Sequence, residues 1–314
     1  VSPGLNSWMA SLSTLTVESA PNPKLRWEKT RTTNVGLDWS LFGYRFTGTL
    51  EWYYRMTSDL LGRRPADPTL GWHEVLVNYG KMLNTGVELT ILGELLHRGD
   101  FRLNSNLVFS YNRSKLLSVR GVGESVVSRV MGPVAVEGYP FGSLFSYRFA
   151  GLSPANGSPQ VYLHRGSVGK KAESLEDLTY SGTVIPQYTG NFALTFGWKG
   201  FDLTAGVLYY GGHVMRRPVS MYYSWLGGAV GYDRDYLHVW KRPGDEELAE
   251  TVPAPSTESG IDQAEQYAWS AADKHILRAD YLKLNVVVLS YTFPEQWLTP
   301  AKIAGLQLIF QVDN

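Results

Sequence analysis

Residues 34–55 read NVGLDWSLFGYRFTGTLEWYYR, two stretches of alternating side chains around one tight turn. In the first stretch the apolar residues all fall on one face: Val35, Leu37, Trp39 and Leu41. After the turn at Gly43 the alternation resumes for about ten residues, the length that a tilted β-strand needs to cross a bilayer. A period of two residues is typical of a strand with one apolar face. The segment therefore predicts a β-hairpin with long strands.

The same alternation returns along the rest of the chain. It covers the segments 86–91, 101–112, 192–198, 201–209, 281–293 and 305–312. The run 285–291, NVVVLSY, loses the alternation and predicts a β-bulge. No segment has the pattern of a long amphipathic helix, so the sequence predicts an all-β protein of about ten strands.

The connections between these strands alternate between short and long. The short ones are turns at 41–44, 97–100, 153–159 and 198–201. The long ones are irregular stretches at 62–80, 120–142, 166–186 and 215–279. Outer-membrane barrels have short periplasmic turns and long extracellular loops. We therefore expect an antiparallel transmembrane β-barrel, here represented by a partial set of strands.

Composition excludes several classes of function. The 29 basic and 29 acidic residues give no net charge, so we expect no nucleic-acid partner. Cysteine is absent, and the six histidines show no spacing typical of a metal site, so we expect no metal. No nucleophile elbow, phosphate loop or dinucleotide fingerprint is present. The sequence therefore predicts neither an enzyme nor a cofactor.

Two groups of residues are candidates for a functional site. The first is a set of polar side chains on the strand face opposite the apolar one, expected to line a lumen: Glu51, Tyr53, Arg55, Glu88 and Arg102. We expect the carboxylates of this set to pair with Arg45, Arg55 or Arg102. The second is an aromatic cluster in the longest loop: Tyr222, Tyr223, Trp225, Tyr232, Tyr236 and Trp240. These rings either contact a substrate or pack the loop against itself or a neighbour. The following stretch, 241–266, is polar and rich in proline, which is typical of a mobile loop.

Alternation alone leaves other proteins open, because it does not say which strand face meets water. One alternative is a soluble, secreted all-β glycan-binding module or glycan-active enzyme, with the aromatic side chains in a cleft. Another is a passive porin. The length of the strands and the asymmetry of the connections favour the membrane barrel.

Five segments resemble the late barrel of SusC/RagA-type TonB-linked outer-membrane transporters. They occur in the order of that family and cover 22–61, 77–91, 137–162, 184–204 and 277–294. The resemblance includes NPKLRWE near the start and EGYPFG in the middle, and it retains the family's acidic position at Asp280. Lys283 stands where the family commonly has arginine.

The resemblance implies that residues 1–314 are the C-terminal part of a barrel domain, with the N-terminal plug region and the last strands absent. It implies a place in the outer membrane of a Gram-negative bacterium of the Bacteroidota type, in contact with outer-membrane lipid. It further implies import of a glycan or peptide nutrient, a SusD-like surface lipoprotein as partner, and energy from TonB–ExbB–ExbD through the absent N-terminal region.

Overall fold

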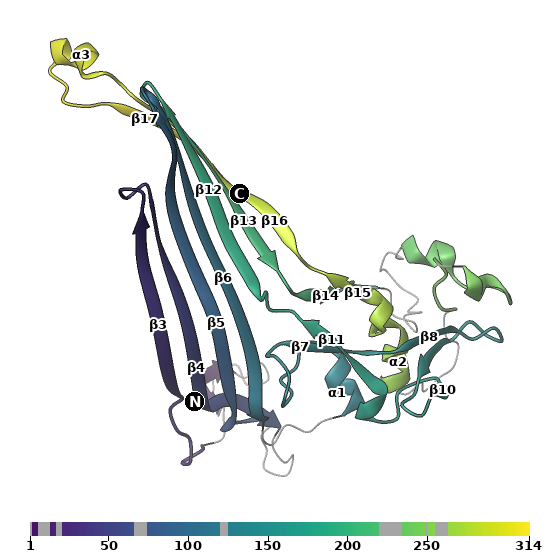
Figure 1. Ribbon diagram of the computed structural model, residues 1–314. Helices are drawn as coiled ribbons and strands as arrows, with labels where there is room; N and C mark the ends of the chain where they lie inside the picture. The colour runs from purple at the N-terminus through teal and green to yellow at the C-terminus, as the bar shows by residue number, and fades with distance from the viewer. Residues whose placement is uncertain are drawn as a thin grey trace.

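The computed structural model is dominated by one antiparallel sheet of long strands (Figure 1). It describes residues 2–5, 13–16, 21–65, 74–119, 125–219, 234–248, 250–254 and 263–314. The sheet order is β17-β16-β13-β12-β6-β5-β4-β3. Its strands are β3 (Lys29–Leu41), β4 (Phe46–Pro65), β5 (Glu74–Arg98), β6 (Phe101–Val119), β12 (Tyr188–Trp198), β13 (Phe201–Gly211), β16 (Tyr281–Thr292) and β17 (Gln307–Asp313).

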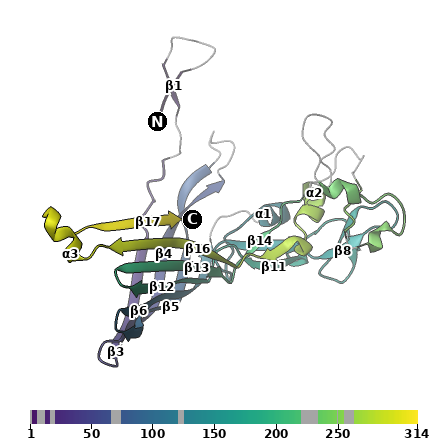
Figure 2. The ribbon, with the colours of Figure 1, turned by 90° about the horizontal axis from the view of Figure 1, so that it is seen from above.

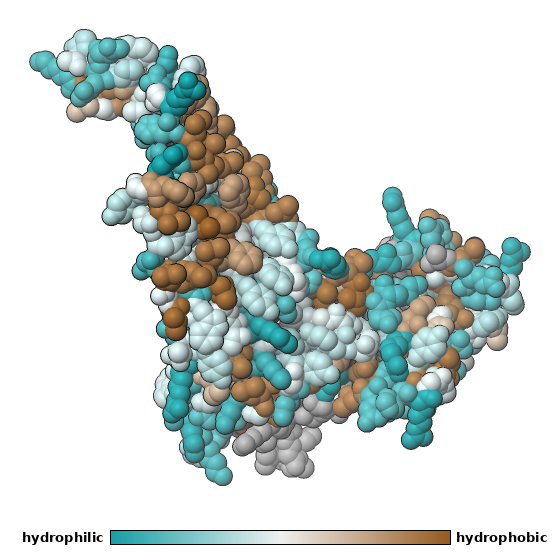
Figure 3. Space-filling view, in the orientation of Figure 1, coloured by the Kyte–Doolittle hydropathy of each residue, from teal (hydrophilic) through white to brown (hydrophobic). Residues whose placement is uncertain are grey.

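The pairing register sorts the alternating side chains onto two faces. One row across the sheet runs through Leu37, Leu50, Leu89, Phe109, Gly190, Tyr209 and Leu282. The next row runs through Gly36, Glu51, Glu88, Ser110, Thr189, Tyr210 and Tyr281. We call the two sides the apolar face and the polar face. Side chains of the apolar face are exposed, with 60% of Leu37 and 66% of Phe310 accessible. Figure 3 shows hydrophobic side chains gathered along the sheet, with hydrophilic ones at both ends.

Two rows of aromatic side chains bound the apolar face. At one end Phe101 stacks on Trp198, with ring centroids 5.8 Å apart, and Phe201 lies 4.4 Å from Tyr291. At the other end Tyr111 stacks on Tyr188 at 5.0 Å. Tyr188 and Trp198 are the first and last residues of β12, so the rows lie about 33 Å apart along the strand. A strand tilt of about 40° reduces this to about 25 Å, the height of the apolar band of an outer-membrane barrel.

The two ends of the sheet differ in their connections, as the sequence predicts. At the short-turn end, four residues (42–45) join β3 to β4, and two residues join β5 to β6 and β12 to β13. The first turn is tight enough to place Phe42, Gly43 and Tyr44 at positive φ. The β16–β17 connection at this end is longer and carries α3 (Glu295–Leu298) and the 3-10 turn η6 (Thr299–Ala301). The long connections lie at the opposite end.

The predicted bulge in 285–291 is confirmed. Gly206 pairs with Val286 and Val207 pairs with Leu284, so Asn285 has no partner on β13. This extra residue keeps both Leu284 and Val287 on the apolar face. Among the described residues, eight strands join the main sheet, where the sequence predicts a partial set of about ten strands. The turn at 153–159 was also misplaced: it closes a small hairpin of β8 and β9 within the long connections, because these strands have only four residues each and do not span the sheet.

The described parts of the β6–β12 and β13–β16 connections fold into a separate unit with its own core, which we call the loop domain (Figure 1). Its short strands are β7 (Ser143–Tyr147), β8 (Phe149–Leu152), β9 (Pro159–Tyr162), β10 (Val168–Gly169), β11 (Leu178–Thr183), β14 (Val214–Arg216) and β15 (Ile276–Arg278). Its helices and 3-10 turns are α1 (Val126–Val130), α2 (Gln263–Ser270), η2 (Leu175–Asp177), η3 (Arg234–His238), η4 (Asp245–Glu247) and η5 (Asp273–His275). A further hairpin, β1 (Ser2–Leu5) with β2 (Ser13–Thr16), lies apart from it.

Segments distant in sequence build the core of the loop domain. Val130, Tyr147, Val161, Ala172, Ala268 and Ala271 form one buried cluster. The Tyr147 hydroxyl donates to the carbonyl of Ala264 over 2.9 Å, and the backbone N–H of Phe149 donates to Asp273 Oδ1 over 3.1 Å. Figure 2 shows the loop domain to one side of the strands. Among the described residues, no helix has both the length and the apolar character needed to cross a membrane.

Candidate functional site: the polar face and the loop domain

The sequence places five candidate residues on the polar face, and the register brings four of them close together. Glu51 on β4 lies opposite Glu88 on β5, and Tyr53 and Arg55 follow on β4 at alternate positions. The guanidinium carbon of Arg55 lies 5.6 Å from the centre of the Tyr53 ring. These side chains form a polar patch near the middle of β4 and β5, level with the loop-domain end of β12. Arg102 lies at the other end of the sheet, beside the short turns.

Two polar contacts on this face pass over a glycine of the intervening strand. The Tyr53 hydroxyl of β4 donates to Asn112 Oδ1 of β6 over 3.0 Å, and Gly86 of β5 lies between them. Arg102 of β6 pairs with Asp202 of β13 at 3.0 Å, across β12. Each contact therefore ties three neighbouring strands together on the polar face.

The expected pairing of the carboxylates with arginines is wrong for Glu51. Its carboxylate accepts a hydrogen bond from Asn34 Nδ2 at 3.3 Å instead. Arg102 pairs with Asp202, and Arg45 lies 3.7 Å from Glu94. The register pairs Gly36 with Glu51 and Asn34 with Tyr53, so Asn34 lies diagonally opposite Glu51, two residues from Gly36 along β3. Asn112 and Asp202 were not among the site residues predicted from the sequence. The signal that could have identified them is their position on the strand face opposite the apolar residues.

The aromatic candidates of the longest loop fall mostly outside the described residues. This holds for Tyr222, Tyr223, Trp225 and Tyr232, and for the side chain of Tyr236, whose backbone belongs to η3. Trp240 is described and is half-buried. Its indole lies against Gly157, and Nε1 donates to Glu246 Oε2 over 2.9 Å. Trp240 therefore packs within the loop domain.

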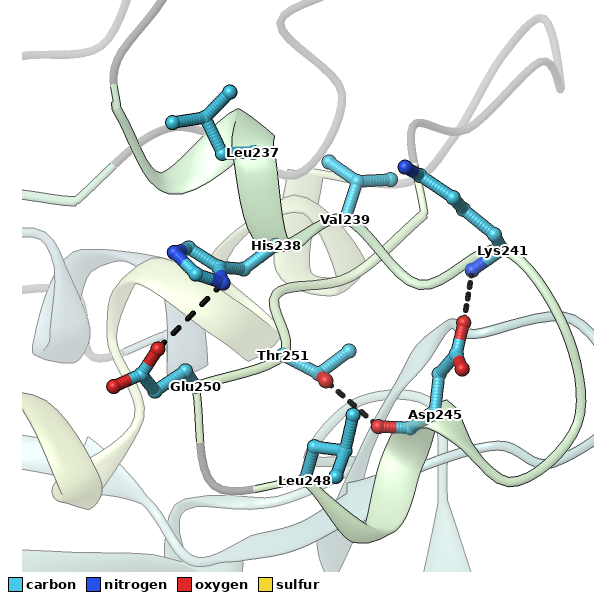
Figure 4. Close-up of a pocket in the computed structure, with 8 residues that line it drawn as sticks. All are labelled: Leu237, His238, Val239, Lys241, Asp245, Leu248, Glu250 and Thr251. Atoms are coloured by element: carbon cyan, nitrogen blue, oxygen red, sulfur yellow. Dashed lines mark hydrogen bonds and ion pairs between the residues drawn. The ribbon is translucent and has the colours of Figure 1, made fainter.

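A pocket of about 420 Å³ lies beside Trp240 in the loop domain (Figure 4). His238 Nδ1 and Glu250 Oε2 approach to 3.6 Å at one side of it. At the other side the backbone N–H of Lys241 donates to Asp245 Oδ2, and Thr251 Oγ1 donates to the Asp245 carbonyl. Hydrogen bonds from the N–H groups of Lys241 and Arg242 hold the pKa of the Asp245 carboxyl below its usual range. The polar groups that line this pocket are therefore already paired with one another.

A second pocket, of about 360 Å³, shares His238, Glu250 and Thr251 with the first. It is also lined by Arg217, Lys274 and His275, which sequence reasoning missed. Lys274 and His275 are neighbours in the sequence, but Arg217 lies in a distant segment, so only the fold reveals the cluster. Within the part of the chain that the structure describes, no group of His, Asp and Glu side chains could hold a metal ion.

The protein family follows from comparison with known sequences. A family described as "TonB dependent receptor-like, beta-barrel" matches residues 5–314. The chain belongs to this family. The predicted resemblance to SusC/RagA-type transporters and the predicted β-barrel fold are confirmed, and the chain is an outer-membrane protein. The alternative of a soluble, secreted β module is wrong, and the family is one of receptors and transporters rather than enzymes.

Individual members of the TonB-dependent receptor family show how much of the fold is shared. TonB-dependent receptor P3 of Formosa agariphila is 22% identical over 313 residues, covering 93% of this chain and 30% of the relative. TonB-dependent receptor SusC of Bacteroides thetaiotaomicron is 30% identical over 105 residues, covering 33% of this chain and 10% of the relative. The solved structure of the RagAB peptide transporter superposes with a TM-score of 0.76 at 25% identity, covering 99% of this chain and 34% of that one. The chain therefore spans about a third of the length of the matched RagAB chain and of receptor P3.

Proposed function

We propose that this chain supplies late strands and extracellular loops of a transporter that imports a glycan or peptide nutrient in a TonB-dependent manner. The observation that carries the proposal is the pair of faces on one long sheet. The apolar face is bounded by aromatic rows that lie about 25 Å apart across the membrane at a strand tilt of about 40°. The opposite face carries polar side chains suited to a water-filled lumen. The superposition with the RagAB peptide transporter supports a peptide as the nutrient.

The open edges of the sheet support the view that these strands are one piece of a barrel. Among the described residues, β3 and β17 each pair on one side only. In hydrocarbon every unpaired backbone group costs several kcal/mol, so a lipid-facing sheet has to close on itself. Further strands beyond the eight are therefore needed to complete the wall. In this arrangement the chain forms wall and loops, while gating and the contact with TonB lie in other regions of the transporter.

The loop domain is the part of the chain placed to meet a nutrient or a partner. Its strands and helices extend from the looped end of the sheet, which corresponds to the outside of the cell in outer-membrane barrels. Loops supported by a rigid scaffold commonly carry binding residues. A SusD-like lipoprotein covering these loops would enclose a captured ligand before TonB acts.

Nutrient uptake by the native organism tests the proposal. The gene for the full-length protein is deleted, and growth is measured on a peptide mixture or on single polysaccharides as the limiting nutrient. We expect growth to fail on one of these nutrients and to recover with the full-length gene. Recovery should be lost when tonB is deleted in the complemented strain. Growth that recovers without TonB would instead indicate a passive porin.

Co-purification gives an independent test of the partner. The full-length protein is extracted from outer membranes in mild detergent, and its complexes are weighed by native mass spectrometry. We expect a stable complex with one surface lipoprotein. A full-length protein that runs alone under conditions that preserve other outer-membrane complexes would contradict the proposed partner.

A further inference from the structure

The pocket of about 360 Å³ in the loop domain differs from its neighbour in the charges that face it. Arg217, Lys274 and His275 line it together with Trp269, and Asp235 and Glu250 supply the acidic groups. Glu250 lies 3.6 Å from His238, and Asp235 lies 3.9 Å from Arg217 at the limit of an ion pair. Glu250 and Asp235 therefore each lie close to a basic side chain of the same pocket.

Lys274 is held in position by aromatic rings rather than by an acid. Its ammonium nitrogen lies 4.6 Å from the centre of the Trp269 ring and 4.8 Å from that of Phe149. No carboxylate of the described residues lies within ion-pair distance of it. Cation–π contacts fix an ammonium group without neutralising it. The charge of Lys274 is therefore preorganised and available to an anion.

His275 lines the same pocket and is almost completely buried, with 2% of its surface exposed. Its ring meets Trp269 edge-on at 4.6 Å, and Nε2 has no hydrogen-bond partner among the described residues. A buried polar atom without a partner costs free energy, so such atoms are rare and are commonly satisfied by a bound molecule. Nε2 of His275 therefore marks the pocket as a place for a ligand.

Cationic side chains act on His275 in this pocket. Burial lowers the pKa of His275 to about 4, and the charged neighbours that lower it further are all cations, Lys274, Arg217 and Arg216. Burial, and then Arg217, also lowers the pKa of the Lys274 ammonium. Cations that lower one another's pKa values are stabilised together by a bound anion.

We propose that this pocket binds a carboxylate group of the imported nutrient, with Lys274 and Arg217 as its donors and Trp269 as an apolar wall. The carboxylate comes either from a peptide or from a uronic acid sugar, since both present the same planar anion. Arginine and lysine recognise that anion through charge-assisted hydrogen bonds. The proposal rests on the proposed import function and names a chemical class for its ligand.

Binding to the full-length protein in detergent tests this site. The probes are a tetrapeptide with a free C-terminal carboxylate, the same tetrapeptide as a C-terminal amide, a galacturonic acid trisaccharide and a neutral galactose trisaccharide. We expect one acidic probe to bind roughly tenfold or more tightly than its neutral counterpart, because charged hydrogen bonds are lost in the latter. Preference for the acidic peptide identifies a peptide source, and preference for the uronate identifies a glycan source.

Variants connect this preference to the pocket. The double substitution Lys274→Met with Arg217→Met should remove the preference for the acidic probe, and Lys274→Arg should retain it. Lys170→Met is the matched control, because Lys170 pairs with Glu265 at 3.8 Å and has a similar exposure, 57% against 52% for Arg217. Limited proteolysis of each variant checks that the loop domain remains folded.

Three results would overturn the carboxylate site. They are equal binding of acidic and neutral probes, unchanged preference in the double variant, and equal loss in Lys170→Met. Growth in the uptake experiment is independent of these results. A protein that supports TonB-dependent growth but binds acidic and neutral probes alike refutes the pocket and leaves the import function standing. A protein that prefers the acidic probe but is dispensable for growth refutes the import function.

Discussion

Arg102 on β6 and Asp202 on β13 form an ion pair of 3.0 Å that passes over Gly197 of the strand between them. The two side chains are separated by 100 residues along the chain. A Cβ atom at Gly197 would lie 2.7 Å from Asp202 Oδ1 and 3.0 Å from Arg102 Nε. The absence of a side chain at this position is what lets the charges meet.

Gly197→Ala should separate this ion pair without disturbing the sheet. The atoms in the way are the ends of two flexible side chains, which can move aside. We expect a loss of about 0.2–1 kcal/mol, the range for partly exposed ion pairs. The measurement is the temperature at which the full-length barrel loses its compact band on a gel in detergent. Asp202→Asn should produce a similar loss, and combining it with Gly197→Ala should add little. Full additivity of the two losses would show that the pair is not what Gly197 protects.

Gly86→Ala should be far more damaging, because the obstacle there includes backbone. A Cβ atom at Gly86 would lie 2.4 Å from the carbonyl oxygen of Tyr111 and 2.4 Å from the hydroxyl of Tyr53. Overpacking of this kind costs about 1–3 kcal/mol, and the hydrogen bond from Tyr53 to Asn112 is lost as well. The same gel assay measures this loss of stability. Gly36→Ala is the matched control, since its nearest atom, Glu51 Cγ, lies 3.6 Å away. Equal stability of the two variants would contradict the contact.

Local patterns in the sequence predict the wall of the barrel well. The alternation through Leu37 and Leu50 identifies the apolar face, and the loss of phase after Leu284 identifies the bulge at Asn285. Both are properties of neighbouring residues in one strand, so the sequence records them directly. The polar face follows from the same alternation, which is why Glu51 and Arg102 were placed on it.

Partners across the sheet and within the loops could not be predicted in this way. The partner of Arg102 is Asp202, and β12 joins β6 only after the chain has left the sheet and returned. The core of the loop domain brings Tyr147 together with Ala268, and its pocket combines Arg217 with Lys274. Such contacts depend on chain topology and leave no periodic signal.

Arg216 should be required for a folded loop domain. Its guanidinium donates to the carbonyls of Val130 and Phe145, each over 2.6 Å, and so joins β14 to α1 and β7. Burial lowers the pKa of this guanidinium, and hydrogen bonds to a charged group contribute about 1.5–3 kcal/mol. Arg216→Met should therefore expose residues 126–147 to hydrogen exchange and to proteases. The strands of the main sheet should retain their protection.

Arg242→Met is the control for Arg216→Met, because the Arg242 side chain is 84% exposed and contacts only nearby Asp245 among its described ion pairs. If the two variants exchange at the same rate in 126–147, the role assigned to Arg216 is wrong.

The loop domain should lose stability in mild acid through His275. Burial, followed by the charges of Lys274, Arg217 and Arg216, lowers the pKa of this histidine from 6.5 to about 4. The unfolded loop domain therefore takes up the proton first as the pH falls. Its contribution to stability is complete above pH 6.5 and is lost progressively toward pH 4, by about 3 kcal/mol in all. Hydrogen exchange of 263–280 in the full-length protein, corrected for the intrinsic rate at each pH, should show faster opening at pH 5 than at pH 7.5.

His275→Phe should flatten this pH dependence, because phenylalanine packs against Trp269 without titrating. His164→Gln should leave it unchanged, since the His164 side chain is 61% exposed. A pH dependence that survives in His275→Phe would assign the titration to another group.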